Sequence, residues 1–154
     1  MRFPHCVGMA LAFGLLSQPA LAETESDKGI EYFMSELSFY TVIEQLNVAL
    51  DAKGLSVVAR VDHAKNAADN DLELAPTTTF IFGNPNVGTP MMQCQGSIAL
   101  DLPQKMVIRE TEEGVRLEWN DPHYLAERHG LETCDLPLDN VADILREIAE
   151  RGAS

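Results

Sequence analysis

The side chains of this chain that could carry chemistry are two histidines and a group of sulfur-containing residues. Met91, Met92 and Cys94 place three soft sulfur atoms within four residues, and Cu(I) or haem iron accepts such donors. His63 and His129 add imidazole, which titrates near neutral pH and is the commonest metal ligand. These residues support one hypothesis, a metal- or haem-binding protein that uses His and Met donors.

The same side chains also have ordinary structural interpretations. Neither histidine occurs in a ligand spacing such as His-x-x-x-His or His-Glu-x-x-His. His63 suits a local hydrogen bond at a helix start, and His129 suits a favourable interaction at a helix end. Methionine fills irregular gaps in a core. The sequence has no Cys-x-x-Cys-His motif, which excludes covalent c-type haem.

No enzyme template is recognisable in the sequence. Gly-x-Ser-x-Gly, a glycine-rich phosphate loop and Cys-x-x-Cys are all absent. The acidic pair Glu112-Glu113 falls in a predicted turn, where carboxylates are solvated rather than catalytic. Asn84, between Gly83 and Pro85, either lines a cleft at a strand end or only forms the turn. We therefore expect no catalytic residue and favour a non-catalytic binding or interaction module with an unknown ligand and no predicted cofactor.

Residues 1–22 have the form of a secretory signal peptide. Arg2 gives the short basic start, residues 7–16 form an apolar run, and Ala20-Leu21-Ala22 is a small-x-small cleavage site. The apolar run is shorter than the ~20 residues that span a bilayer. We therefore predict a periplasmic or secreted protein without a transmembrane segment after signal removal. Residues 23–29 are predicted to be a flexible N-terminus, and residues 30–154 a single domain.

Charge and cysteine count describe the predicted mature chain further. The full chain carries a net charge of −13, and removing Arg2 makes it one unit more negative. Such a field repels phosphate backbones, so nucleic acid is not an expected partner.

Cys6 leaves with the signal, and the remaining pair, Cys94 and Cys134, favours a disulfide in an oxidising compartment. That bond would close a loop of about 40 residues and contribute up to roughly 4 kcal/mol. The alternative is that both thiols are soft metal ligands.

Hydrophobic periodicity predicts most of the elements. Residues 30–37 have strand composition, and Ser38 can cap a helix that Gly54 ends. Residues 55–61 alternate as a half-buried strand, and residues 77–82 are apolar on both faces, as in a central strand. A short helix is predicted from Asp62 to Ala68, and a further helix has Thr89 as its N-cap and Pro90 as its first residue. Residues 105–110 and 115–120 are predicted to form a hairpin. A short helix from Asp121 to Gly130 and a closing helix over residues 136–148 complete the predicted elements.

Successive strands with helices set apart predict an α+β fold. The expected order is β-α-β-β-β-β-α, with a mainly antiparallel sheet and helices on one face.

Several short blocks in the sequence stand out together. They are Lys53-Gly54-Leu55, Arg60-Val61-Asp62-His63-Ala64, Leu74-Ala75-Pro76-Thr77, Phe82-Gly83-Asn84-Pro85, Ala99-Leu100-Asp101-Leu102-Pro103 and Asn120-Asp121-Pro122. In this order, the blocks resemble a bacterial family of domains of unknown function, DUF302. The chain departs from the family pattern at Arg109-Glu110-Thr111 and at Trp119. The resemblance implies a fold similar to the TATA-binding-protein-like fold, homodimers, and membership among exported members with two cysteines. It implies no reaction.

Overall fold

The computed structural model describes residues 28–154, so the predicted signal peptide and nearly all of the predicted flexible segment lie outside the described residues. The elements of the described part are, in chain order, β1 (Ile30–Ser35), α1 (Phe39–Ala52), β2 (Ser56–Asp62), α2 (His63–Ala68), β3 (Thr77–Gly83), α3 (Pro85–Cys94), the 3₁₀ helix η2 (Gly96–Leu100), β4 (Gln104–Thr111), β5 (Gly114–Asn120), α4 (Pro122–His129) and α5 (Leu138–Ala153).

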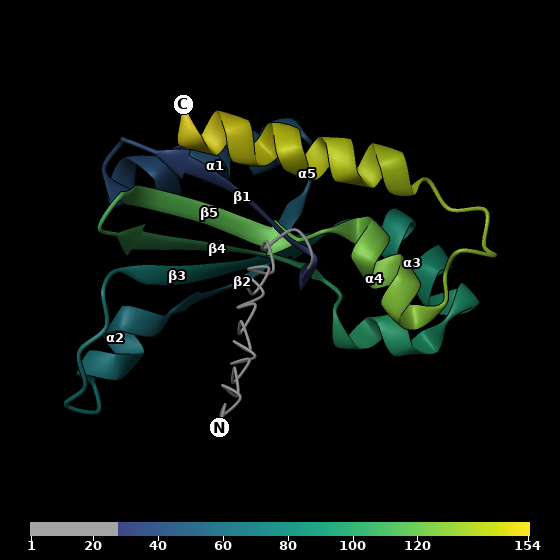
Figure 1. The fold of residues 1–154 in the computed structure, drawn as a ribbon, viewed down its shortest axis with the longest axis horizontal. Coiled ribbons are helices and arrows are strands. Elements are labelled where there is room, and N and C mark those ends of the chain that lie inside the picture. The colour runs from purple at the N-terminus through teal and green to yellow at the C-terminus, as the bar shows by residue number, and fades with distance from the viewer. Residues whose placement is uncertain (1–27) are drawn as a thin grey trace, which may run out of the picture.

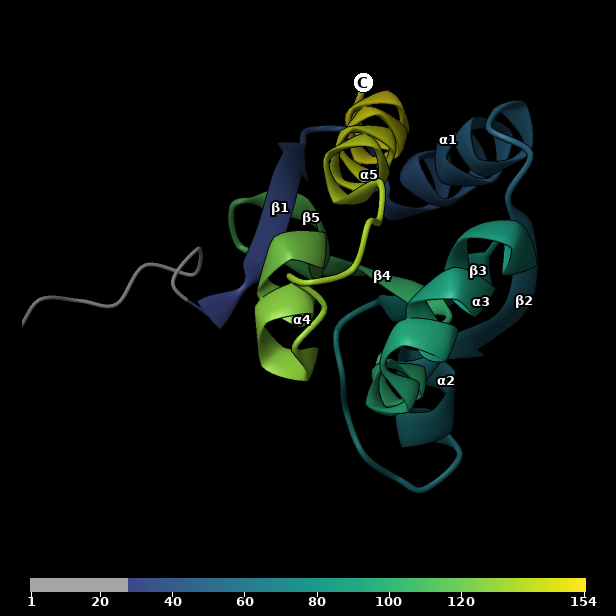
Figure 2. The ribbon, with the colours of Figure 1, turned by 90° about the vertical axis from the view of Figure 1, so that its right-hand side faces the viewer.

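The five strands form one sheet in the order β1-β5-β4-β3-β2, and every neighbouring pair is antiparallel. Helices α1 and α5 lie side by side over one face of this sheet (Figures 1 and 2). The predicted α+β class and the predicted helix layer on one face are therefore confirmed. Strand β3 has a neighbour on each side, as its apolar composition indicated, whereas β1 and β2 are the two edges.

Local sequence signals place several element ends where they were predicted. The Ser38 hydroxyl accepts a hydrogen bond from the Thr41 amide at 3.2 Å, which caps α1. Gly54, just after α1, has a φ of +64°, and Gly130, just after α4, has a φ of +71°. Glycine ends both helices because it adopts left-handed angles without steric cost. Asp62 caps α2 by accepting from the Lys65 amide at 2.8 Å.

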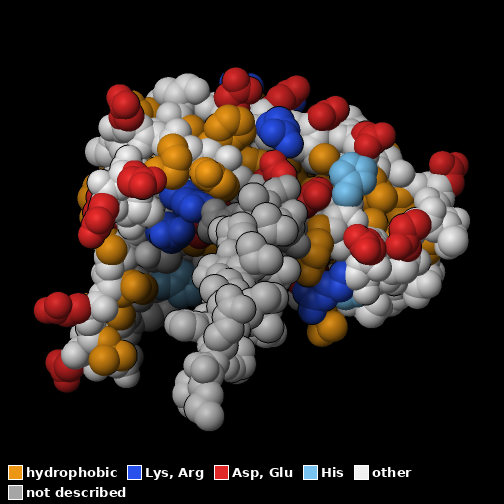
Figure 3. Space-filling view, in the orientation of Figure 1, with side chains coloured by type: hydrophobic (Ala, Val, Ile, Leu, Met, Phe, Trp, Pro, Cys, Tyr) orange, Lys and Arg blue, Asp and Glu red, His pale blue; other side chains and the backbone are white. Residues whose placement is uncertain are grey.

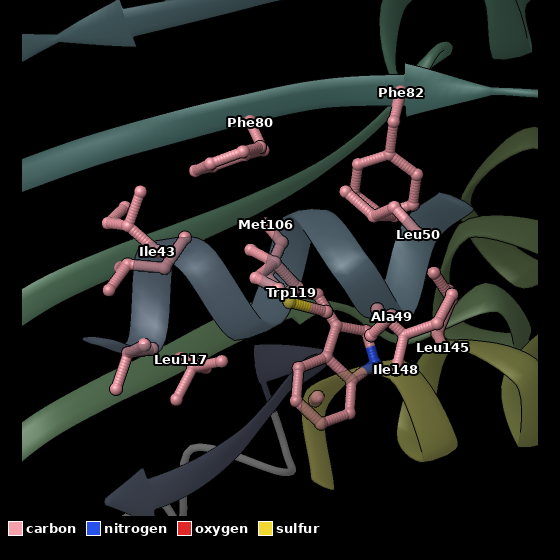
Figure 4. Packing of buried hydrophobic residues seen from close by; sticks show 14 of the residues in the cluster. Ile43, Ala49, Leu50, Phe80, Phe82, Met106, Leu117, Trp119, Leu145 and Ile148 are labelled. Atoms are coloured by element: carbon pink, nitrogen blue, oxygen red, sulfur yellow. The ribbon is translucent and has the colours of Figure 1, made fainter. Parts of the chain in front are cut away.

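The main core lies between the sheet and the two long helices (Figure 4). Alternate residues of β3, β4 and β5 point into it, including Phe80, Met106 and Leu117, all fully buried. The apolar stripe of α1 faces them, with Leu46 fully buried. Because strand side chains alternate between faces, the intervening residues lie on the other face of the sheet, where Arg109 and Arg116 occur together with Ile81 and Val107.

A second, smaller core lies beyond one end of the sheet, and we call it the satellite core. Its buried residues come from α3, η2, α4 and the loop after α4: Met91, Ile98, Leu125, Ala126 and Leu131. Both cysteines of the described part pack against it. In Figure 1 this region lies at the opposite end of the molecule from α2.

Two predictions about local structure are wrong. The segment predicted as a half-buried strand is an edge strand, β2, in which nearly every residue is exposed. A β-bulge between Val57 and Ala59 breaks the alternation that the sequence suggested. Helix α3 begins at Pro85 with Asn84 as its N-cap, so Thr89 is not the cap and Pro90 lies inside the helix. Asn84-Pro85 provides the same cap-then-proline start as Asp121-Pro122, and it comes first along the chain.

Candidate functional site

The main feature of the described surface is an apolar cavity of about 390 Å³ at the junction of the two cores. Helix α3 supplies one wall, with Val87, Met91 and Met92. The first turns of α5 supply the opposite wall, with Ile144 and Leu145 among its residues. The cavity is therefore bounded by elements that are about 50 residues apart in sequence.

The ends of three strands complete the cavity. Phe82 on β3 contributes its buried ring, Leu55 precedes β2, and Val58 belongs to β2. Leu102 and Pro103 close the side next to β4. Val58 lies at the bulge of β2, between Val57 and Ala59.

Helix α3 is held in place as a wall by its cap and by close packing. The Asn84 side-chain oxygen accepts a hydrogen bond from the Asn86 amide at 2.9 Å, so Asn84 starts the helix at the cavity edge. Gly88 faces the connection between η2 and β4. A Cβ added at Gly88 would meet only Leu102, at 3.6 Å. Met91 is 5% exposed and belongs to the satellite core, whereas Met92 is more exposed at 38%. Of the predicted binding residues, Asn84, Met91 and Met92 are thus brought together here.

The chemistry of the lining is uncharged. Its polar members are Ser56, Asn84, Thr89 and Gln104, and no residue that lines the cavity is ionisable. The side-chain oxygen of Gln104 is buried and has no hydrogen-bond partner among the residues that the structure describes. Pockets for small ligands are typically concave, mostly apolar and ~300–1,000 Å³ in volume, with a few polar groups. This cavity has the size and lining to hold an uncharged apolar group.

Two cysteines lie close together beside the cavity walls. Cys94 is the last residue of α3, and Cys134 lies in the loop that leads to α5. Their Cα atoms are 6.5 Å apart, a separation that a disulfide can span. Because each cysteine belongs to the segment that carries one wall, a bond between them would restrain the separation of the walls.

His129 lies outside the cavity, in a hydrogen-bonded cluster between α4 and η2. Its Nε2 is 2.6 Å from the Asp101 carboxylate, and its Nδ1 is 2.9 Å from the Ser97 hydroxyl. The His129 side chain is only 5% exposed, and Arg128 forms a second ion pair with Asp101 at 3.2 Å. The neutral ring can donate from Nε2 to the carboxylate and accept at Nδ1 from the hydroxyl. The cluster therefore fastens η2 to α4 within the satellite core.

His63 lies in a third place. Its Nε2 is 2.8 Å from the Thr79 hydroxyl, which joins α2 to β3. In Figure 1, α2 and α4 lie at opposite ends of the sheet, so His63 and His129 do not meet, and neither lines the cavity that holds Met91 and Met92. Residues 28–154 contain no group of three or more His, Cys, Asp or Glu side chains that could hold a metal ion. The four predicted donors thus lie in three separate places, and only Met91 and Met92 lie together.

Sequence reasoning missed most of the cavity. Phe82, Val58 and the α5 residues gave no functional signal, because each reads as an ordinary strand or helix residue. Ser97 and Asp101 were also missed as partners of His129. The only available signal was that Asp101 belongs to Ala99-Leu100-Asp101-Leu102-Pro103, one of the blocks that carry the family resemblance.

Comparisons with known proteins agree with the fold. The sequence model of the family described as "Domain of unknown function DUF302" matches residues 31–151. A crystal structure of an uncharacterised conserved DUF302 protein from Bacillus stearothermophilus superposes with a TM-score of 0.62 at 17% identity. That match covers 81% of this chain and 93% of the other. At this identity, the likeness concerns the fold alone.

Two sequence relatives are longer proteins that are named as ion channels. The chain is 41% identical over 106 residues to "Fluoride-specific ion channel FluC 1" from Brucella suis biovar 1 (strain 1330) and from Brucella abortus biovar 1 (strain 9-941). The match covers 68% of this chain but only 42% and 39% of those proteins. The chain therefore spans about two fifths of the length of these relatives. Across residues 28–154, no helix combines the length and apolarity needed to cross a membrane.

Proposed function

This chain belongs to the DUF302 family of domains of unknown function, and on that premise we propose that it is a periplasmic binding module that holds an uncharged apolar group in the cavity between α3 and α5. The observation that carries the proposal is the cavity itself. It has about 390 Å³ of space and no ionisable lining residue in a chain of net charge −13. Acidic side chains are spread over the rim of the face shown in Figure 3.

The charge difference between the cavity and the rest of the surface supports selection for uncharged ligands. Burying a charge without a partner costs far more than burying an apolar group. The lining gives a charged group no counter-charge, because none of its residues is ionisable. The ligand class is accordingly an uncharged, mainly apolar group.

An uncharged fluorescent probe tests this proposal. N-phenyl-1-naphthylamine should brighten on binding to the protein, and Gly88→Leu should abolish the signal by filling the cavity. A Cβ at Gly88 has room, so the variant is expected to fold. The matched control is Gly96→Leu, because Gly96 does not line the cavity and a Cβ there would meet nothing within 4 Å. No brightening, or brightening that survives in Gly88→Leu, would contradict the proposal.

Export, an oxidised cysteine pair and a homodimer belong to the same proposal. The signal-like residues 1–22 and the even cysteine count after their removal support export and oxidation. Native mass spectrometry of unreduced protein from a periplasmic extract tests all three. We expect a mass without residues 1–22, two hydrogens fewer than the dithiol, and a species of twice that mass.

A second candidate function is that of an accessory module for a fluoride channel. The support is the 41% identity over 106 residues to two proteins that carry that channel's name, in which the matched part is a minority of the length. A domain that occurs within one polypeptide with another activity can also act on it as a separate chain. The test is fluoride efflux from vesicles that contain such a relative without its matched 106 residues, with and without this protein added. Unchanged efflux and no co-purification would remove this candidate.

A further inference from the structure

The unpaired edge strand β2 lies beside the cavity. Strand β2 pairs with β3 on one side only, and no described strand pairs with its other side. Its residues Val57 and Val58 are 40% and 65% exposed, and Val58 also lines the cavity. A bound peptide whose backbone pairs with β2 could therefore place an apolar side chain in the cavity beside Val58.

This edge has only some of the features that keep edge strands from pairing. Proteins protect exposed edges with charged side chains, prolines, short strands, bulges or covering segments. Strand β2 is seven residues long and carries Arg60, Asp62 and one bulge, but neither lysine nor proline. Val58, at that bulge, lines the cavity. A row of unpaired backbone groups next to an apolar pocket is the arrangement used for strand addition, in which the backbone gives affinity and the pocket gives specificity.

The charges along β2 indicate the chemistry of the partner. Arg60 is exposed, and its guanidinium lies 5.1 Å from the centre of the Phe80 ring. It forms no ion pair with residues 28–154, although the chain has 24 acidic and only 11 basic residues. In the sheet register Arg60 pairs with Phe80, which is two residues from the cavity residue Phe82. A carboxylate on an added strand would give this cation its missing partner.

We propose that the ligand of the cavity is an apolar side chain on an extended protein segment that adds to β2 as a sixth strand, with an acidic residue two positions away that pairs with Arg60. The two-residue spacing follows because same-face side chains on a strand are two residues apart, like Phe80 and Phe82. This inference rests on the proposed function, since it names the molecule to which the apolar group belongs. The segment is uncharged where it enters the cavity, because the lining offers no counter-charge.

A small set of blocked heptapeptides tests the proposal directly. Each has Phe, Leu or Met at the centre, Glu two residues before or after it, and Thr elsewhere as a soluble strand former. We expect at least one peptide to bind the full mature protein with a Kd below about 1 mM, measured by titration calorimetry. Replacing its Glu by Lys should weaken binding at least about tenfold, and N-methylation of alternate backbone amides should do the same.

Variants of the protein locate the binding site. Val58→Asp should weaken peptide binding at least about tenfold, because it places a charge at the cavity mouth. The matched control is Val48→Asp on α1, since Val48 is 64% exposed and does not line the cavity. Arg60→Gln should weaken the Glu peptides and leave their Gln analogues unchanged. Amide hydrogen exchange should show new protection in residues 56–62 when the peptide is bound.

The outcomes separate this inference from the proposed function. Binding of N-phenyl-1-naphthylamine with no binding of any heptapeptide would overturn strand addition and leave the apolar cavity in place. Equal binding of the N-methylated peptides, or no effect of Val58→Asp, would also overturn it. A dimer that Val58→Asp dissociates would mean that a second copy covers β2 and would overturn it as well. Loss of both probe and peptide binding in Gly88→Leu, with both retained in Gly96→Leu, would support both proposals.

Discussion

The main core and the satellite core bury apolar side chains on very different supports. The main core packs two helices of 14 and 16 residues on a five-stranded sheet. The satellite core packs helices of ten and eight residues and a five-residue 3₁₀ helix, without a sheet of its own. Short helices are marginal alone, so a region built from them depends on packing and cross-links. The cysteine pair packs against the satellite core, and the His129 cluster lies within it.

The position of the cavity follows from this difference. Its α5 and β3 residues belong to the main core, whereas Met91 and Leu102 belong to or pack on the satellite core. Side chains interdigitate closely within a core, but two cores with separate supports need not match at their junction. One side of the cavity thus belongs to the well-supported main core, and the other side belongs to the satellite core, which depends on a few contacts. Each prediction below tests whether the two cores depend on different interactions.

The largest expected effect is in the main core. Leu46→Ala removes a fully buried side chain between α1 and the sheet and should lower the free energy of unfolding by about 3–5 kcal/mol. Chemical denaturation monitored by circular dichroism measures it. The control is Val48→Ala on the exposed side of the same helix, which should change stability by less than about 0.5 kcal/mol. Equal effects of the two substitutions would mean that α1 does not form the main core.

The disulfide should matter next, and mainly in the satellite core. Replacing Cys94 and Cys134 together by serine should destabilise the protein by about 2–4 kcal/mol. Hydrogen exchange should rise in α3, η2 and α4 while β3 to β5 keep their protection. Mild reductant should reproduce the effect in the wild type and do nothing to the double variant. Uniform loss of protection across the sheet would show that the two cores unfold as one unit.

The His129 cluster should have a smaller effect in the same region. His129→Ala removes the imidazole that bridges Asp101 and Ser97 and should cost about 1–3 kcal/mol, measured by denaturant unfolding. Arg128→Ala removes only the more exposed ion pair to Asp101 and should cost less than about 1 kcal/mol. If the two variants were equally stable, the buried imidazole would not be what fastens η2 to α4.

The smallest expected effect concerns pH and salt. Because no lining residue is ionisable, the affinity of the cavity for N-phenyl-1-naphthylamine should be constant between about pH 5 and 8 and between low and high salt. The heptapeptides provide the contrast, since pairing of their Glu with Arg60 should weaken as salt rises. A fluorescence titration at each condition measures both. Strong pH dependence of probe binding would place a titrating group beside the ligand.

Much of the regular structure was predictable because local chemistry decides it. Ser38 and Asp62 cap helices by their own side chains, Gly54 and Gly130 end helices by their backbone freedom, and Val115, Leu117 and Trp119 alternate into the core. One of the two errors arose where a neighbouring strand overrides the local pattern, and the other arose because Asn84-Pro85 starts α3 before Thr89-Pro90 can. The bulge at Val58 depends on how β2 pairs with β3, and alternation in the sequence carries no record of it.

The candidate site was predictable only in fragments. Asn84, Met91 and Met92 stood out in the sequence as turn and sulfur residues, and they do lie together at the cavity. The expected histidines do not join them, because His63 and His129 are fastened to Thr79 and to Asp101 at opposite ends of the sheet.

The sequence by itself determined the strands and helices, the class of the fold and the family, because caps, breakers and apolar periodicity act over a few residues. Only the tertiary structure decided which strand edge is free, which donors meet, and that an uncharged cavity opens between α3 and α5. Those features depend on contacts between segments far apart in the chain. Local propensity gives no information about the space that remains where two cores meet.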